Sequence, residues 1–481
     1  MTNLSEILFD KNKNNLDKIA FVDATSSVTY GELEHKVRCL ACWMISKQIG
    51  PGDRISIALV DKIDTIIIFL STVLVGAIAV MHNPKSKNEK LIYQINHVDP
   101  TLIFIEANIK NIISHPSMYT SDEALASSKN LIPWYGIANQ SIDDVAYMLF
   151  TSGTTGNSKA VMLTHNNVIT QCKNVVEETL KISSNDKTFC TAKLYFAIGV
   201  NFAFHGVMWS GSQAYLDSGL ATPSRIRQIL SDYKPTLFYS VPVIYSQVAV
   251  DNCSMPLTAR CYSGGDKLPQ TVLDRWYSYT GQKIYNIYGI TECVSIVCRN
   301  PVGDSGVLSV VSPGYSVRIV DADNNIVNTG TVGRLQIKAD SMAKGYYNDT
   351  EWTEKMFTEW VPTGDLFYAD ASNGYHYVGR ASDVIKIHGQ YINPSELEES
   401  LLKFQGIEQA VVIAIPGKDD IDELEAFVVP VKDVQLDLVN IKRWMLGKHD
   451  KHSCPRVIRV VDELPRTDTG KLERYKLKNI I

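Results

Sequence analysis

Residues Ala146–Leu180 read AYMLFTSGTTGNSKAVMLTHNNVITQCKNVVEETL, and this stretch contains the unit from which the fold is built. The apolar run Ala146–Thr151 predicts a buried strand, and a loop of glycine, serine and threonine follows it. Asn166–Leu180 then predicts a helix. A strand that leads through a loop into a helix is the βα unit of a mostly parallel sheet.

The same alternation of apolar strands and amphipathic stretches extends on both sides of this unit. Further strands are predicted at Arg54–Val60, Thr101–Ile105, Thr236–Ser240 and Lys283–Ile287. The most apolar run, Ile66–Met81, has sixteen residues, whereas a membrane span needs about 20. Because Gly76 interrupts it, we expect a buried helix and then a short buried strand. The first part of the chain is therefore predicted to be α/β.

From Gly314 onward the pattern changes to short strands separated by Asp, Asn and Gly. These strands are predicted to be antiparallel, and a compact α+β unit with its own alternation follows Gly379-Arg380. We therefore predict an N-terminal domain at 1–380, a hinge at 381–383 and a C-terminal domain at 384–481. The predicted elements of this last part of the chain are Ser316–Asp321, Gly333–Lys338, Gly374–Val378, Val384–Ile387, Pro394–Lys403 (helix), Gln409–Ile415, Ala426–Val431, Asp437–Leu446 (helix) and Val457–Val461.

Composition excludes several classes of protein. The chain has 481 residues, of which 45% are hydrophobic and 21% charged, as in ordinary globular proteins and unlike disordered or fibrous ones. With 47 basic and 52 acidic residues, its net charge of −5 argues against nucleic-acid binding. Residues 442–481 nevertheless hold eleven Lys and Arg against five Asp and Glu. That local excess suits an anionic ligand, or is simply a solvated face.

The cysteines indicate a reducing compartment. There are nine, an odd number, and no cleavable leader follows Met1, so we expect a cytoplasmic protein with free thiols. Cys39 and Cys42, with His35 one turn earlier, would share a helical face and could hold a metal ion. Because no second ligand pair lies near them, core thiols are the preferred interpretation.

A first motif follows the strand at 146–151. Backbone N–H groups of such a glycine- and hydroxyl-rich loop can converge on phosphate oxygens, and Lys159 adds a positive charge. It is not a Walker A loop, because Ser158 occupies the place of the second glycine. A polar loop without a ligand is the alternative. The residues concerned are Thr151, Ser152, Gly153, Thr154, Thr155, Gly156 and Lys159.

Three further motifs are weak individually. In Asn286–Glu292, glycine permits close approach of a ligand, Tyr288 offers a flat ring, and Glu292 could hold Mg²⁺, although a strand and a helix cap explain it equally well. In Pro362–Asp365 the carboxylate can accept hydrogen bonds from vicinal hydroxyls. Leu464–Lys471 presents one lysine on a rigid turn, for which a surface lysine is the ordinary explanation.

Together, in this order and spacing, the four motifs resemble the adenylate-forming (ANL) superfamily. The likeness runs over essentially the whole chain and includes Tyr30-Gly-Glu-Leu33, Ser263–Asp266, Gly330–Gly333 and Lys344–Tyr347. It implies a large N-terminal domain with a small β-barrel-like subdomain, and a small mobile α+β C-terminal domain. It also implies an acyl-adenylate made from ATP with release of pyrophosphate, and then transfer to a thiol.

The resemblance assigns roles to individual residues. Thr151–Lys159 would hold the β- and γ-phosphates of ATP, Glu292 would hold Mg²⁺ with Thr291 beside it, and Lys471 would bridge the substrate carboxylate and the α-phosphate. Ser382 would be the hinge, where Asp or Lys is usual; Ser158 and Ala160 also depart from the usual Pro and Gly. The remaining nucleotide-binding residues would be Gly264, Gly265, Asp266, Asn286, Ile287, Tyr288, Gly289, Asp365, Arg380 and Lys386.

The substrate acid is predicted from residues 192–199, AKLYFAIG. No Asp follows the aromatic residue there, which argues against an α-amino acid, and the run resembles the benzoate–CoA ligase branch. Ile198 stands where an aromatic is common and Ser295 where a His can occur, so a hydroxy- or amino-substituted benzoate, or a related aryl acid, is expected in preference to benzoate itself. By this resemblance the pocket would consist of Phe196, Ala197, Ile198, His205, Gly289, Ser295 and Ile296.

The acceptor and the wider setting have alternatives. Coenzyme A and the phosphopantetheine of a separate acyl carrier protein end in the same thiol, so an enzyme loading an aryl or fatty acid onto a carrier is the second candidate. A non-catalytic ATP- or acyl-binding relic and a luciferase-like oxygenase are the others. We expect a monomer or homodimer with no nucleic-acid partner and no membrane span.

Overall fold

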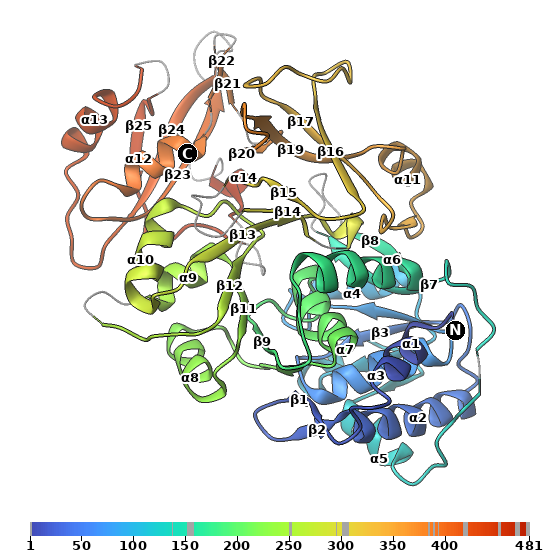
Figure 1. Ribbon diagram of the computed structural model, residues 1–481. Coiled ribbons are helices and arrows are strands. Elements are labelled where there is room, and N and C mark those ends of the chain that lie inside the picture. The colour runs from blue at the N-terminus through green and yellow to red at the C-terminus, as the bar shows by residue number, and fades with distance from the viewer. Residues whose placement is uncertain are drawn as a thin grey trace. The chain divides into compact units, whose positions relative to one another are not determined.

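A computed structural model describes residues 2–136, 138–151, 158–249, 253–294, 296–300, 307–382, 385–387, 390–392, 394–416, 422–450, 454–466 and 472–477 (Figure 1). Contacts along the chain divide it into two compact units. The first unit is Met1–Ser316 with Ile337–Val361, and the second is Val317–Gln336 with Pro362–Ile481. This division is based on contacts within the folded chain and has no boundary at 381–383. It does not test for a hinge, so the predicted domain boundary there stays a prediction.

A nine-stranded sheet is the larger of two sheets in the first unit. Six neighbouring strands, from β13 to β1, run parallel, and β2, β14 and β15 are antiparallel additions at the edges. In spatial order the strands are β15 (Val310–Val311), β14 (Ile296–Arg299), β13 (Ile284–Gly289), β12 (Arg260–Ser263), β11 (Leu237–Ser240), β9 (Lys187–Cys190), β10 (Gln213–Tyr215), β1 (Ile19–Val22) and β2 (Ser27–Thr29).

Helices α8 (Pro223–Tyr233), α9 (Pro242–Val248) and α10 (Gln270–Thr280) lie together beside this sheet (Figure 1). Tyr245 and Trp276 from these helices pack with Phe189 and Phe238 of the strands in one buried cluster. Rings of Phe238 and Trp276 stack with centroids 5.9 Å apart. Because Trp276 is fully buried, truncating it to alanine should cost about 3–5 kcal/mol.

The second sheet of the first unit has seven strands. Its central strands are parallel, and the hairpin β7–β8 with β18 closes one edge in antiparallel pairing. The order is β18 (Gly345–Tyr346), β8 (Lys159–Thr164), β7 (Val145–Thr151), β4 (Ile78–Met81), β3 (Arg54–Ala58), β5 (Leu102–Ile105) and β6 (Met118–Tyr119). The other helices of the unit are α1 (Leu4–Lys11), α2 (Tyr30–Ser46), α3 (Ile63–Leu74), α4 (Asn88–Val98), η1 (Ala107–Ile112), α5 (Ser121–Ser128), α6 (His165–Gln171), η2 (Cys172–Thr179), η3 (Gly199–His205), α7 (Gly206–Ser210), η4 (Thr291–Cys293) and α11 (Thr350–Met356).

The apolar run at 66–81 has the predicted structure. It forms most of the buried helix α3 and then the strand β4, with Gly76 between them at a φ of +86°. Residues that carry a Cβ atom rarely adopt this left-handed backbone conformation, so glycine is the residue that permits the turn. In the part of the chain that the structure describes, every helix is too short or too polar to traverse a bilayer.

The predicted helix at 166–180 is present with a change of winding. It begins as α6 and continues as η2, whose hydrogen bonds have the wider π-helical spacing. Thr164 caps the helix, because its hydroxyl accepts a hydrogen bond from the backbone of Asn167 at 3.1 Å. A second π-helix, η3, follows residues 192–198. π-Helical turns are rare in proteins, but those that occur are often found at functional sites.

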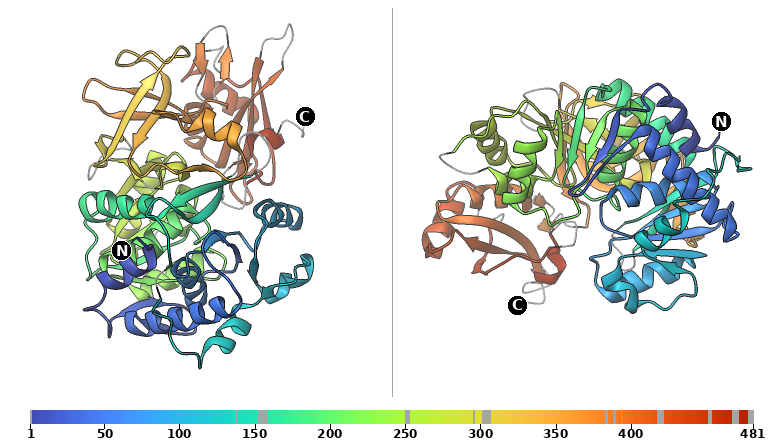
Figure 2. Two further views of the ribbon diagram at one scale, coloured as in Figure 1. Left: turned by 90° about the vertical axis from the view of Figure 1, so that its right-hand side faces the viewer. Right: turned by 90° about the horizontal axis from the view of Figure 1, so that it is seen from below.

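Three smaller sheets of the described residues lie wholly or mostly in the second unit. In one of them β19 (Val361–Ala369) pairs antiparallel with β20 (Tyr375–Arg380). The strand predicted at 374–378 is present as β20, whereas β19 was not predicted. Helices α12 (Pro394–Leu402) and α13 (Leu438–Leu446) pack on one face of the three-stranded sheet, while Leu464 and Leu477 pack on the other. The remaining elements of these sheets are β16 (Tyr315–Val320), β17 (Gly333–Ala339), β21 (Ile385–Ile387), β22 (Gln390–Ile392), β23 (Ile407–Pro416), β24 (Asp422–Pro430) and β25 (Val457–Val460), and α14 spans Arg474–Leu477. Both views of Figure 2 show this last part of the chain, in orange and red, as a compact body.

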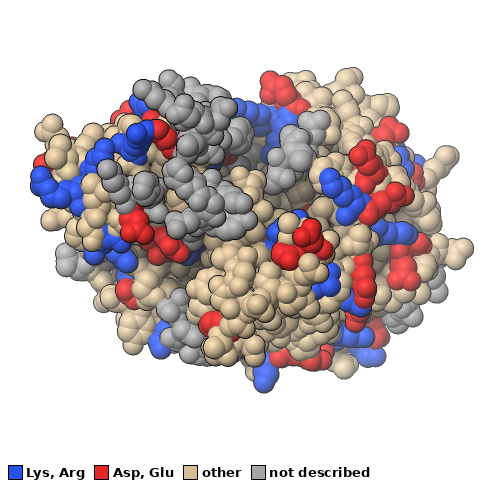
Figure 3. All heavy atoms as spheres, turned by 90° about the horizontal axis from the view of Figure 1, so that it is seen from above, with Lys and Arg blue, Asp and Glu red and all other residues tan. Residues whose placement is uncertain are grey.

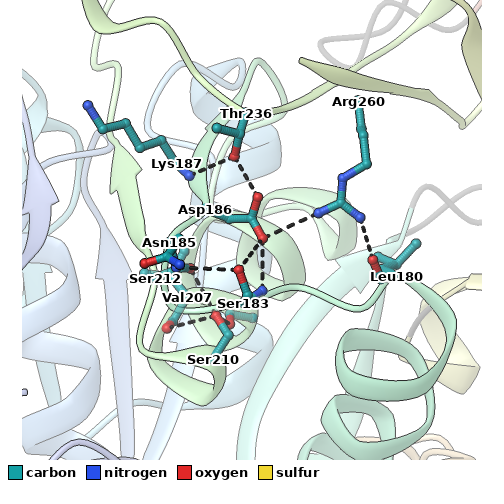
Figure 4. A network of polar contacts seen from close by, with 11 residues as sticks. Leu180, Ser183, Asn185, Asp186, Lys187, Val207, Ser210, Ser212, Thr236 and Arg260 are labelled. Carbon is teal, nitrogen blue, oxygen red and sulfur yellow. Dashed lines mark hydrogen bonds and ion pairs between the residues drawn. The ribbon is translucent and has the colours of Figure 1, made fainter. Parts of the chain in front are cut away.

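A polar network joins the amino ends of three parallel strands in the nine-stranded sheet (Figure 4). Asp186, directly before β9, accepts hydrogen bonds from the hydroxyl of Thr236 at 2.7 Å and from the backbone N–H of Ser183 at 2.8 Å. Arg260, the first residue of β12, lies 3.3 Å from the same carboxylate and donates to the carbonyl of Leu180 at 2.6 Å. These contacts hold the starts of β9, β11 and β12 in register.

Charged side chains of both signs are interspersed over the face of the protein shown in Figure 3. This mixture agrees with the small net charge of −5. On that face no field of a single sign is present among the described residues that could attract a polyanion.

Candidate active site

The chemistry-bearing motifs of the first unit lie at the carboxyl ends of the parallel strands. Strand β11 ends at Ser240 and Thr191 directly follows β9, and the Oγ1 atom of Thr191 lies 2.7 Å from the Oγ atom of Ser240. Strand β12 runs into Gly264 and Gly265, and β13 runs into the segment that carries Glu292. In open α/β sheets, ligands bind at this edge.

The turn after β12 requires glycine. A Cβ atom on Gly264 would lie 2.8 Å from the Cγ1 atom of Ile287 in β13, and Gly265 has a φ of +87°. Asp266 follows on the surface, and its carboxylate accepts a hydrogen bond from the backbone N–H of Lys267 at 2.8 Å. The predicted nucleotide-binding residues 264–266 and 286–289 are therefore neighbours, with Ser263 paired to Asn286.

Glu292 lies in the short helix η4, next to Thr291, and is held from two directions. Its backbone carbonyl accepts a hydrogen bond from the N–H of Ala343 at 2.7 Å. Its carboxylate accepts a hydrogen bond from the hydroxyl of Tyr346 at 2.9 Å. Burial raises the pKa of Tyr346, and the neighbouring Glu292 carboxylate adds to this. Tyr346 therefore keeps its proton and acts as a donor at neutral pH.

Lys159 follows the predicted phosphate loop and is likewise fixed. Thr151 and Lys159 are paired across the β7–β8 hairpin. The Nζ atom of Lys159 lies 2.5 Å from the carboxylate of Asp349 and 4.6 Å from the ring centre of Trp352. The hydrogen bond from Lys159 lowers the pKa of Asp349.

The predicted aryl-pocket residues come from two segments. Phe196, Ala197 and Ile198 are half-buried directly before η3. On β13 and β14, Gly289 pairs with Ile296, which is 3% exposed.

His205 lies in the protein interior. Its ring centre is 5.7 Å from that of Phe69, 5.3 Å from that of Tyr147 and 4.7 Å from that of Phe204. Neither ring nitrogen has a hydrogen-bond partner among the described residues. Burial lowers the pKa of His205 to about 3, so the ring is neutral at physiological pH.

The second unit contains a carboxylate–guanidinium pair. Asp365 and Arg380 are paired across β19 and β20, and their side chains approach to 3.1 Å. Arg380 also donates to the carbonyl of Thr363 at 3.0 Å. Asp365 is 2% exposed. Ser382 lies on the surface in the turn after β20, and Lys386 lies on β21.

Comparison with known families and proteins decides the relationship. Residues 8–347 match the AMP-binding enzyme family, and residues 396–471 match the AMP-binding enzyme C-terminal domain. The chain belongs to the AMP-binding enzyme family. The adenylate-forming superfamily suggested by the sequence is thereby confirmed, and so is its α/β fold.

Relatives of this AMP-binding enzyme include CoA ligases. The chain is 28% identical to the 3-hydroxybenzoate–CoA ligase of Aromatoleum sp. (strain CIB), covering 97% of this chain and 94% of that one. It is 29% identical, at the same coverage, to the 3-hydroxybenzoate–CoA/4-hydroxybenzoate–CoA ligase of Thauera aromatica. A solved benzoate CoA ligase from Burkholderia xenovorans LB400 superposes with a TM-score of 0.91 at 27% identity, covering 99% of both chains.

Three side chains near the predicted site residues of this enzyme were not predicted from the sequence. Tyr346 was part of a recognised motif but had no role, and Asp349 and Trp352 were not considered. Tyr346 contacts Glu292, and its ring centre lies 5.7 Å from the Nζ atom of Lys159. Of these three residues, only Asp349 has a feature that the local sequence could indicate. It caps helix α11, because its carboxylate accepts a hydrogen bond from the backbone N–H of Trp352 at 3.2 Å.

Some predicted residues fall outside the described part of the enzyme. They include the centre of the phosphate loop, one pocket residue and the predicted catalytic lysine, namely Ser152, Gly153, Thr154, Thr155, Gly156, Ser295 and Lys471. Among the described residues no cluster of His, Cys, Asp and Glu is arranged to hold a metal ion. Cys39 is buried and Cys42 half-buried, and both are free thiols, as the preferred interpretation expected.

Proposed function

We propose that this AMP-binding enzyme activates a hydroxy- or amino-substituted benzoate as its acyl-adenylate and transfers the acyl group to coenzyme A. Segment 192–198 carries this proposal. Beyond Lys193 it is aromatic and aliphatic, with Phe196, Ala197 and Ile198 half-buried, and it contains no carboxylate to bind an α-ammonium group. The named activities of the hydroxybenzoate–CoA ligase relatives support an aryl acid.

In the first step, a carboxylate oxygen of the acid would attack the α-phosphorus of ATP. A P–O bond forms to the acid, the bond to pyrophosphate breaks, and pyrophosphate leaves with the electron pair. Both reactants are anions, so cationic groups are needed where charge accumulates. Lys471 is proposed to bridge the carboxylate and the α-phosphate, and Lys159 to neutralise the outer phosphates.

Glu292 is proposed to bind Mg²⁺ together with the phosphates. A carboxylate oxygen is the ligand that Mg²⁺ prefers, and a single protein carboxylate is common for this ion. The hydroxyl of Tyr346 occupies one lone pair of the carboxylate, which would orient the other oxygen. Mg²⁺ would supply charge neutralisation on the phosphates.

For nucleotide recognition, Asp365 is proposed to bind the ribose hydroxyls, with Arg380 and Lys386 in supporting positions. Arg380 lies 3.1 Å from the carboxylate of Asp365, so that carboxylate is charged and oriented as an acceptor. Residues 264–266 and 286–289 are proposed to hold the adenine.

In the second step, the thiol of coenzyme A would attack the acyl carbonyl carbon. A C–S bond forms, the C–O bond to AMP breaks, and the thiol proton is lost. The basic residues of 442–481 would attract the acceptor, and Ser382 is the proposed hinge between the two steps. A separate acyl carrier protein is the alternative acceptor, because it presents the same thiol.

ATP–pyrophosphate exchange tests the proposal. Exchange should occur with substituted benzoates, not with amino acids or long-chain fatty acids, and should be lost in Lys471→Ala. Thioester formation is then measured with coenzyme A and with a phosphopantetheinylated carrier. Exchange confined to fatty or amino acids would refute the aryl assignment, and exchange with no acid would favour a non-catalytic protein.

A further inference from the structure

Residues 192–198, which precede the π-helix η3, are anchored by two aspartates from other parts of the first unit. One is Asp61, between β3 of the seven-stranded sheet and helix α3. The other is Asp217, which follows β10 of the nine-stranded sheet. Both are almost fully buried, at 5% and 4% exposure. Buried carboxylates are rare and normally have a specific partner.

Asp61 binds the segment through its backbone. The N–H of Leu194 donates to both carboxylate oxygens of Asp61, at 3.1 and 3.3 Å. Leu194 is itself only 1% exposed, so this N–H has no access to water and depends on the carboxylate. Two residues later the chain reaches Phe196, the first of the proposed pocket residues.

Asp217 binds the preceding residue of the segment. The Nζ atom of Lys193 donates to the backbone carbonyl of Asp217 and lies 3.6 Å from its carboxylate. The guanidinium of Arg225, on α8, holds the same carboxylate at 2.6 Å. Since Arg225 already neutralises Asp217, the charge of Lys193 is also available to Asp61.

The backbone immediately after the segment is tightly packed and leaves no room for a side chain at Gly199. A Cβ atom on Gly199 would lie 2.1 Å from the carbonyl oxygen of Lys193, so the chain folds closely back on itself there. From this point η3 begins, and Phe202 on it stacks on Tyr239 of β11 with ring centres 4.7 Å apart. The segment is therefore fixed at both ends, and Phe196, Ala197 and Ile198 lie between the two fixed points.

We propose that Asp61 is a positioning residue for the carboxylic-acid substrate, because it fixes the backbone of segment 192–198 and thereby the pocket side chains that follow. This inference rests on the proposed function. It gives a residue that follows strand β3 of the seven-stranded sheet control over acid binding by a segment that follows strand β9 of the nine-stranded sheet. Asp61 acts through the backbone of Leu194, without touching the substrate.

Ionisation of Asp61 should make binding of the acid depend on pH, which a residue that serves only for packing would not do. Burial raises the pKa of Asp61 to about 7. The charge of Asp217 also raises this pKa, whereas the charges of Lys193 and Lys85 lower it. The thiol of Cys190 also faces it. An ionised carboxylate accepts a stronger hydrogen bond than a neutral one, so the acid should bind more tightly as the pH rises from 6 to 8.

Asp61→Asn keeps the shape of the side chain and removes its charge. We expect the KM for the acid in pyrophosphate exchange to rise about fivefold with the KM for ATP unchanged, because one charged hydrogen bond becomes neutral. The KM for the acid should also lose its pH dependence between 6 and 8. Asp186→Asn is the control, since it is the same substitution in a half-buried network at the amino edge of the nine-stranded sheet, away from the proposed site; it should leave both KM values unchanged.

Folding stability gives a second signature. The folded-state pKa of Asp61 is raised above its unfolded value, so its contribution to stability is complete at low pH and is lost as the pH rises through 7. The melting temperature of the wild type should therefore fall between pH 6 and 8 more steeply than that of Asp61→Asn.

Equal KM values in the wild type and Asp61→Asn, or an equal rise for acid and ATP, would overturn the inference while leaving the proposed function intact. If Asp61→Asn does not fold, Lys193→Gln decides by the same criterion, with an expected rise of about fivefold in the KM for the acid alone. Absence of exchange in the wild type with every acid would instead refute the proposed function.

Discussion

The two edges of the nine-stranded sheet are built from similar residues but differ in what their polar groups contact. At the amino edge, Asp186 is surrounded by hydrogen-bond donors from Ser183, Thr236 and Arg260 (Figure 4). At the carboxyl edge, Glu292 receives a side-chain hydrogen bond from Tyr346. The comparison suggests that satisfied carboxylates stabilise the fold at one edge, while the other edge is arranged to receive a ligand.

The largest effect is expected for Glu292→Ala. Loss of the proposed metal-binding carboxylate should reduce the rate of pyrophosphate exchange about 10²- to 10³-fold, the range seen when one group that stabilises developing charge is removed. Exchange is measured at saturating Mg²⁺ and ATP. A loss that a higher Mg²⁺ concentration restores would sharpen the assignment, and an unchanged rate would remove Glu292 from the mechanism.

The next effect is expected for Gly264→Ala. The new Cβ atom would lie 2.8 Å from Ile287, so β12 and β13 must separate slightly where adenine is proposed to bind. We expect the KM for ATP to rise about tenfold, in line with an overpacking cost of about 1–3 kcal/mol, with little change in the KM for the acid. Gly50→Ala is the matched control, because its backbone, like that of Gly264, is not left-handed and no atom lies within 4 Å of the new Cβ.

A smaller effect is expected for Tyr346→Phe. The substitution removes the hydrogen bond to Glu292 and keeps the ring, so the carboxylate stays but is less well oriented. Exchange should fall about threefold to tenfold, because the hydroxyl acts only by orienting the carboxylate and the net contribution of one hydrogen bond is about 0.5–1.5 kcal/mol. A loss as large as that of Glu292→Ala would mean that the hydroxyl itself contacts the reacting groups.

The smallest effect on catalysis is expected for Asp186→Asn at the amino edge. Its hydrogen bonds weaken, so the free energy of unfolding should fall by about 1–3 kcal/mol, measured by urea denaturation. The kinetic constants should match those of the wild type at a temperature where both are folded. A selective change in either KM would contradict the division of roles between the two edges.

Much of the fold was predictable because strand and loop signals are local. The apolar runs at 54–60, 236–240 and 283–287 became β3, β11 and β13 with ends shifted by at most two residues. The change to π-helical winding after Gln171 was not predictable, since it depends on packing around the helix. Nor was the grouping of β19 and β20 with the second unit, which depends on contacts far apart in the sequence.

The candidate site was predictable only where a motif identifies it. Glu292, Lys159 and Asp365 follow from motifs in the sequence, whereas Asp349 and Asp61 do not. Asp349 lies 190 residues from Lys159 along the chain and Asp61 lies 133 from Leu194. Both aspartates acquire these roles through tertiary contact: the local sequence marks Asp349 only as a helix cap, and no local pattern marks Asp61.

Pyrophosphate exchange with 3-hydroxybenzoate, compared among the wild type, Glu292→Ala and Asp186→Asn, tests the central claim most directly. The account predicts exchange in the wild type and in Asp186→Asn at similar rates, and near-complete loss in Glu292→Ala. Equal impairment of the two folded variants, or a wild type active only with acids that are not aryl acids, would contradict it.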